Sequence, residues 1–196
     1  MPRSADSFKK LREFSQQMIL DKALKVFAKK GFDATKMADL SKIIGISQGL
    51  IYHYFPSKEE LFNTLVKRAT DISARALRSI ANMQASPREK IEALSRRMVQ
   101  LAATDEVAVN NFMLMIQVGM RNGFNEQVQA YDSTPVRMLK EIIEEGQRCG
   151  QVVMGDPIRL TYLYWACVEG ICVNKITHGN QFPIPEAQQL NRLLLV

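Results

Sequence analysis

The fold of this chain depends on the stretch Gly45-Ile-Ser-Gln-Gly-Leu-Ile-Tyr-His-Tyr-Phe-Pro-Ser-Lys-Glu-Glu-Leu-Phe62. Its first glycine permits a tight turn, because a positive φ costs little only for glycine. Ser47 can cap a short helix, and Pro56 ends that helix. Ser57 and Glu60 have capping-box spacing, which opens a long helix. The pattern predicts the second half of a helix-turn-helix, which places a short helix in the major groove of DNA.

Two helices are predicted before this stretch. The first covers about residues 15–30, where apolar side chains recur at steps of three and four and Gly31 follows as a stop. The second covers about residues 37–44, and Thr35 can cap it. In the third helix, over about residues 47–54, the expected inward side chains are Leu50 or Ile51 together with Tyr54.

Helical patterns continue through the second half, so the sequence predicts an all-α protein. The long helix opened by Ser57 runs to about residue 82. A kink or break is expected at Pro135. Further helices are predicted over about residues 86–103, 107–120, 125–149, 156–178 and 185–195.

Composition is typical of a globular chain. The 196 residues are 46% apolar and 23% charged. No apolar run approaches the roughly 20 residues that span a bilayer, and no signal core follows the first residues. We therefore expect a cytoplasmic protein without a membrane partner. Three cysteines without metal-ligand spacing are expected to be free thiols, with redox sensing by one of them as the alternative.

The positive charge is confined to the segment that carries the turn motif. Residues 1–68 hold 13 Lys or Arg against 7 Asp or Glu, whereas residues 69–196 hold 13 of each. A basic segment favours a polyanionic partner such as DNA, although a solvated basic surface would look the same.

Catalytic and metal-binding motifs are missing from the sequence. His53 and His178 are the two histidines, and neither lies near a carboxylate pair at ligand spacing. There is no glycine-rich phosphate loop, nucleophile elbow or Cys-x-x-Cys. We expect no enzyme activity, no metal and no cofactor.

The order of these features resembles the TetR (tetracycline-repressor-like) family of transcriptional regulators. The resemblance covers about residues 15–66: helix, glycine, Thr35, short helix, Gly-Ile-Ser-x-Gly, then Leu-Ile-Tyr-x-Tyr-Phe-x-x-Lys-Glu-x-Leu. It implies a helix-turn-helix DNA-binding domain over residues 1–56, joined by the long helix to a larger helical domain over residues 57–196. It also implies a homodimer on double-stranded DNA and a small-molecule effector bound by the second domain.

Candidate DNA contacts lie on and around the third helix. Gln48 can pair with adenine edges, and Gly49 lets the backbone approach the bases. The resemblance implies phosphate contacts for Tyr52 and Lys58, and Lys58 also lies next to a helix N-terminus, where phosphates bind. For His53 a solvent-facing role is the alternative. The full set is Thr35, Lys36, Ser47, Gln48, Gly49, Tyr52, His53 and Lys58.

Candidate ligand contacts in the second half rest on the resemblance, since a methionine or aromatic side chain at helical spacing belongs to a core more often than to a pocket. They are Phe112, Met113, Met120, Tyr162, Trp165 and Glu169. Glu169 interrupts an apolar segment, so its carboxylate must find a partner or reach an edge. It can pair across a dimer interface, bind a cationic ligand or contact water.

The expected function is a ligand-responsive, homodimeric transcriptional regulator, with repression as the expected direction. The apolar helix 156–178, together with Leu190, Leu193 and Leu194, is expected to form a two-fold interface of four helices. The alternative is a ligand-independent dimeric DNA-binding protein whose second half is purely structural. A helical binding module or enzyme with an incidental turn motif is the third possibility.

Overall fold

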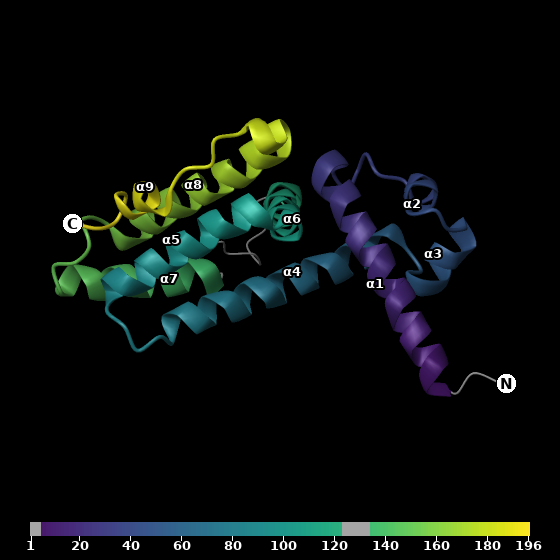
Figure 1. Cartoon of the computed structure of the whole chain (residues 1–196), viewed down its shortest axis with the longest axis horizontal. Helices are drawn as coiled ribbons and strands as arrows, with labels where there is room; N and C mark the ends of the chain where they lie inside the picture. The colour runs from purple at the N-terminus through teal and green to yellow at the C-terminus, as the bar shows by residue number, and fades with distance from the viewer. Residues whose placement is uncertain (1–4, 123–133) are drawn as a thin grey trace. The chain divides into compact units, whose positions relative to one another are not determined.

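The computed structural model describes residues 5–122 and 134–196. The chain divides into two compact units, Met1–Arg68 and Ala69–Val196, which are described separately below. The division falls twelve residues later than the boundary expected after residue 56, because the first turns of the long helix pack within the first unit. Figure 1 shows the chain as helices joined by short connections.

The first unit consists of three helices and the start of a fourth. They are α1 (Ala5–Lys30), α2 (Met37–Ile44), α3 (Gln48–Tyr54) and α4 (Lys58–Ala81), which continues into the second unit. The bounds of α2 and α3 confirm the prediction. Helix α1 begins about ten residues before its expected start. Its early residues lack the apolar periodicity that the prediction depended on, and Leu11 and Phe14 are exposed.

The core of the first unit is built around three phenylalanine rings. Phe27 of α1, Phe32 of the following loop and Phe62 of α4 pack with ring centroids 4.8 to 6.0 Å apart. The two pairs made by Phe62 are edge-to-face, and aromatic pairs stabilise a core by about 0.5–1.5 kcal/mol each beyond their buried area. Each of the four helices also contributes buried aliphatic side chains, among them Ile19, Leu40, Ile51 and Leu65.

The second unit is a helical assembly. It contains α5 (Pro87–Thr104), α6 (Glu106–Asn122), α7 (Thr134–Arg148), α8 (Pro157–His178), the short 3-10 helix η2 (Gly179–Gln181) and α9 (Ala187–Asn191). A Ser86–Glu89 capping box starts α5, and the Asp156 side chain caps α8. In the described residues α7 has Pro135 in its first turn, where proline is tolerated. The expected helix start near residue 125 lies outside the described residues.

The end of the chain packs into the second unit's own core. Helix α9 is shorter than predicted and lies against α5 (Figure 1). Leu190 and Leu194 are 4% and 0% exposed, and Leu193 packs against the same cluster. Leu190 and Leu194 are therefore not available to the expected dimer interface, whereas Leu193 is half-buried. The spacing of the leucines predicted an apolar helix face. It did not indicate whether that face packs against a partner subunit or against α5 of the same chain.

Among residues 5–122 and 134–196, none of the helices is long and apolar enough to cross a membrane.

Candidate DNA interface

The turn between α2 and α3 is set by Gly45. Its φ is +81°, and its N–H donates to the Ser41 carbonyl at 2.9 Å. The N–H of Ile46 donates to the same carbonyl at 3.1 Å, so the end of α2 is closed by two hydrogen bonds. A side chain at position 45 would be strained by the positive φ. The chain consequently leaves α2 in one defined direction and enters α3 after only three residues, 45–47.

Helix α3 is anchored at one face and free at the other. Ser47 caps it by accepting a hydrogen bond from the Leu50 N–H at 3.2 Å. Ile51 is fully buried and Phe55, the first residue after the helix, is 2% exposed. Leu50 is 39% exposed, so Ile51 is the inward residue, and Tyr54 is half-buried. A helix of seven residues is not stable alone, so these anchors fix its orientation.

The free face of α3 carries every residue that was expected to point outward. Ser47, Gln48, Gly49, Tyr52 and His53 are all exposed. Gln48 and Tyr52 are four residues apart and therefore share one side of the helix. A side-chain amide, a backbone without a Cβ and a phenol are groups that can hydrogen-bond base edges and phosphates or approach them closely.

Thr35 does not belong to this surface. Its side chain is 1% exposed, and its hydroxyl donates to the Gly31 carbonyl at 2.6 Å. Its backbone N–H donates to the Phe32 carbonyl at 3.2 Å. Both donors of Thr35 are thus used inside the loop, and the expected DNA contact is corrected to a structural role. Thr35 is also not the cap of α2, since Lys36 occupies that position without a side-chain hydrogen bond.

Lys36 and Lys58 differ in what their ammonium groups can reach. Lys36 is exposed on the surface. The Lys58 ammonium instead donates to the carbonyls of Phe32 and Thr35, at 2.9 and 3.0 Å. It also lies 4.1 Å above the centre of the Phe32 ring. The lysine expected to meet a phosphate at the start of α4 is directed into the protein.

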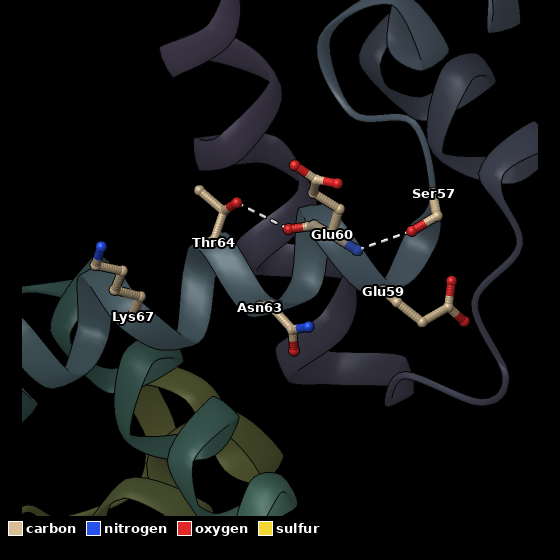
Figure 2. Close-up of a pocket in the computed structure, with 6 residues that line it drawn as sticks. All are labelled: Ser57, Glu59, Glu60, Asn63, Thr64 and Lys67. Atoms are coloured by element: carbon tan, nitrogen blue, oxygen red, sulfur yellow. Dashed lines mark hydrogen bonds between the residues drawn. The ribbon is translucent and has the colours of Figure 1, made fainter.

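Figure 2 shows the side chains that line a shallow pocket beside the start of α4. The Ser57 hydroxyl accepts from the Glu60 N–H at 3.0 Å, as expected for the helix cap. Glu59 and Glu60 place two carboxylates on the first turn. Carboxylates at a helix N-terminus complement the helix dipole, and they repel an incoming phosphate. The start of α4 is therefore a weaker anion site than its sequence suggested.

Lys22 is a residue that the sequence patterns did not single out. Its ammonium reaches from α1 to the Ile44 carbonyl, at 2.8 Å. That carbonyl is in the last turn of α2, where a positive charge is favourable. Only the pairing of two distant segments reveals the contact, because the two residues are 22 positions apart.

The six candidate ligand contacts differ widely in their burial within the described part of the chain. Trp165 is buried, whereas Met120 is 81% exposed and Glu169 is also exposed. Phe112, Met113 and Tyr162 are half-buried. The two best-formed surface pockets of the described residues are lined by none of these six side chains. Met120 is therefore corrected from a pocket residue to a surface residue.

Two buried donors without partners lie in the second unit. The side-chain amide nitrogen of Asn110 on α6 and the indole nitrogen of Trp165 on α8 make no hydrogen bond, and the two helices pack against each other. Asn110 is 1% exposed and Trp165 is 8% exposed. Buried polar groups without a partner are rare in native proteins and call for an explanation. Asn110 was missed because an isolated asparagine in a helix gives no local signal.

Glu169 and Cys172 are one turn apart on α8. Partial burial among apolar neighbours raises the pKa of the Glu169 carboxyl, although the residue keeps contact with solvent. Burial, and secondarily the Glu169 charge, raises the pKa of the Cys172 thiol to about 12. A thiol protonated at neutral pH is a poor nucleophile and metal ligand. Within the described residues no three His, Cys, Asp or Glu side chains are grouped to hold a metal ion.

Comparison with known proteins supports the geometry. Residues 19–65 match the N-terminal sequence model described as bacterial regulatory proteins, tetR family. The fatty acid metabolism regulator protein of Bacillus subtilis is 26% identical over 145 residues, which is 72% of this chain and 73% of that protein. The negative transcriptional regulator IcaR of the Staphylococcus aureus biofilm operon icaADBC is 29% identical over 139 residues, 63% of this chain and 73% of that one.

Solved structures share the fold. A TetR-like transcriptional regulator from a Rhodococcus species has a TM-score of 0.72 and 22% identity, over 98% of this chain and 95% of that one. AibR in complex with isovaleryl coenzyme A and operator DNA has a TM-score of 0.70 and 16% identity, over 90% and 94%. With a helix-turn-helix built as described above and a sequence match over residues 19–65, the first unit belongs to the TetR family of bacterial regulatory proteins, and the chain shares the fold of TetR-like regulators.

Proposed function

We propose that the chain is a homodimeric repressor that binds a palindromic operator through α3 and leaves it when a small molecule binds the second unit. The observation that carries this proposal is the exposed face of α3, held outward by the Gly45 turn and the buried Ile51. The excess of Lys and Arg in residues 1–68 supports it, because phosphate neutralisation supplies most of non-specific DNA affinity. The similarity to a negative regulator supports repression.

A ligand-independent dimeric DNA-binding protein remains the second candidate. It is favoured by one observation, that the six expected ligand contacts line neither of the two best-formed pockets of the described residues. The unpartnered donors of Asn110 and Trp165 favour the ligand-responsive form instead, since a bound molecule would satisfy them.

The experiment that tests DNA binding is selection of bound duplexes from a random library. Two α3 helices related by a two-fold axis must enter major grooves on one face of the DNA. The recovered site is expected to be a palindrome with half-site centres about 34 Å apart, or a multiple of one helical turn. Recovery of no preferred site, or of a site without two-fold symmetry, would contradict the proposal.

The same selection repeated with Gln48→Ala tests the proposed base contact. The variant should lose about 1–3 kcal/mol of binding free energy on the recovered site and relax the preference at one position of each half-site. Gln188→Ala is the matched control, because Gln188 is exposed on α9 in the second unit. A Gln48→Ala variant that selects the same site as wild type would remove Gln48 from the interface.

A dimer surface is proposed on the outward side of α8. Leu163 and Val173 are 47% and 39% exposed, and Ala166 and Gly170 lie between them at steps of three and four. This spacing puts all four on one face of the helix. By contrast, the exposed positions of α7 carry charges, such as Glu141. An apolar stripe with small residues lets two helices approach closely.

Substitution by a charged residue has different expected effects on this surface and in the core. Leu163→Glu should leave the folded subunit nearly as stable as wild type, within about 0.5 kcal/mol, but dissociate the dimer. Leu190→Glu should instead lower the free energy of unfolding by at least about 3 kcal/mol, because it buries a charge in the core. Sedimentation and denaturant unfolding of both variants give the comparison. A dimeric Leu163→Glu variant would place the interface elsewhere.

The proposed effector is a small molecule with a hydrogen-bond acceptor and an apolar part. The acceptor would meet the nitrogens of Asn110 and Trp165, and apolar side chains such as Phe112 would contact the rest. Two similar proteins make acyl-CoA the first class to test, since one is a fatty acid metabolism regulator and the other is in complex with isovaleryl coenzyme A. A ligand shifts the protein off DNA only if it binds the two states with different affinity.

Asn110→Leu tests the effector site through the buried amide itself. The variant removes a buried unpaired amide, so the free energy of unfolding should rise by about 1 kcal/mol. Its response to isovaleryl coenzyme A should weaken, as measured by the emission of Trp165, the single tryptophan, and by release from the selected duplex.

Ser95→Ala is the control for this prediction. The Ser95 hydroxyl is hydrogen-bonded to the Tyr164 hydroxyl at 3.2 Å, and both are buried. Its removal leaves a buried hydroxyl unpaired, so stability should fall by about 1–2 kcal/mol. An Asn110→Leu variant that is destabilised yet responds normally would show that this amide is structural.

A further inference from the structure

The ammonium group of Lys58 is surrounded by acceptors that belong to the protein. It donates to two backbone carbonyls, Phe32 at 2.9 Å and Thr35 at 3.0 Å. The ring of Phe32 lies beneath it, 4.1 Å away at the centre. An ammonium has three donors, so two of the three are committed to the loop that joins α1 to α2. A group held in this way differs from a surface lysine that extends towards a phosphate.

The two carbonyls mark the ends of one turn of the loop. The Thr35 N–H donates to the Phe32 carbonyl at 3.2 Å, which closes the turn just before the Lys36 cap of α2. Hydrogen bonds from a charged donor are roughly twice as strong as neutral ones. Lys58 therefore holds the segment that leads directly into α2.

A second side chain of helix α4 contacts this loop. Phe62 is one turn after Lys58, and its ring meets the Phe32 ring at 4.8 Å. The loop residue Phe32 is thus held by a ring and by an ammonium group from the same helix. Only residues 55–57 separate the end of α3 from the start of α4. The contact consequently links the entry to α2 with the exit from α3.

Lys22 makes a related contact at the other end of α2, where its ammonium donates to the Ile44 carbonyl at 2.8 Å. One lysine fixes the segment before α2 and another fixes its last turn. Since Gly45 then sets the direction of α3, the orientation of α2 decides how α3 is presented.

We propose that Lys58 is a positioning residue for DNA binding: it orients α3 through the loop and α2 and does not neutralise a phosphate. This inference rests on the proposed DNA-binding function. Its consequence is measurable, because each neutralised phosphate adds about 0.9 to the slope of log affinity against log salt. A positioning lysine changes affinity and leaves that slope unaltered.

The test compares Lys58→Met with Lys36→Met on a mixed-sequence DNA duplex and on the selected duplex. Both substitutions remove one charge and keep an unbranched side chain, but Lys36 is exposed and makes no side-chain cap bond. Lys58→Met should weaken binding to the selected duplex about tenfold with the wild-type salt slope. Lys36→Met should reduce the slope by about one.

Backbone amide hydrogen exchange, measured on the protein without DNA, tests whether Lys58 holds the loop independently of whether the protein binds DNA. Amides of residues 31–40 should exchange faster in Lys58→Met than in wild type, and at the wild-type rate in Lys36→Met. If the protein does not bind DNA at all, the proposed function fails while the exchange result still decides whether Lys58 holds the loop.

A slope reduced by about one in Lys58→Met, with unchanged exchange in residues 31–40, would overturn the proposal and make Lys58 a phosphate contact. Unchanged affinity for the selected duplex would overturn it as well. Should Lys58→Met fail to fold, wild-type protein with 15N-labelled lysine gives the answer. An ammonium held by two carbonyls yields a slowly exchanging signal that persists in the DNA complex, whereas one that moves to a phosphate shifts on binding.

Discussion

The packing of Phe27, Phe32 and Phe62 is the interaction on which the first unit depends. These rings come from α1, from the loop before α2 and from α4, and they join α4 to a loop and a helix some 30 residues earlier in the sequence. The short helices α2 and α3 have eight and seven residues and gain little stability from their own hydrogen bonds. They are held in place because the segments around them are packed. A surface for DNA can therefore be built from a helix that would not persist alone.

Much of this unit follows from local sequence signals. The bounds of α2, the Gly45 turn and the Ser47 cap were predicted, because a positive φ and an N-cap each depend on a few neighbouring atoms. The roles of Thr35 and Lys58 were not predicted, because their hydrogen-bond partners are carbonyl groups of the folded loop. A threonine before a helix and a lysine at a helix start have the same sequence pattern whether they face solvent or the interior.

In the second unit as well, the sequence patterns did not predict which surfaces pack against each other. The spacing of the leucines in the last helix gave an apolar face, but only the folded chain shows that Leu190 and Leu194 pack on α5. The exposed apolar side of α8, marked by Leu163, is the surface proposed above for a partner subunit. No sequence pattern indicated that the side-chain nitrogens of Asn110 and Trp165 would lack hydrogen-bond partners. Such groups lower stability, which proteins tolerate where function requires them.

Helix α3 is proposed to present its exposed face to duplex DNA, and photo-crosslinking is the most direct test. A p-benzoylphenylalanine placed at position 52 in the outward face, in place of Tyr52, is irradiated in complex with the selected duplex. The same residue at position 154 is the control, since Met154 is 81% exposed in the second unit. We predict crosslinks from position 52 to the recognised half-sites and none from position 154. Bound DNA that crosslinks to position 154, or to neither position, would contradict the account.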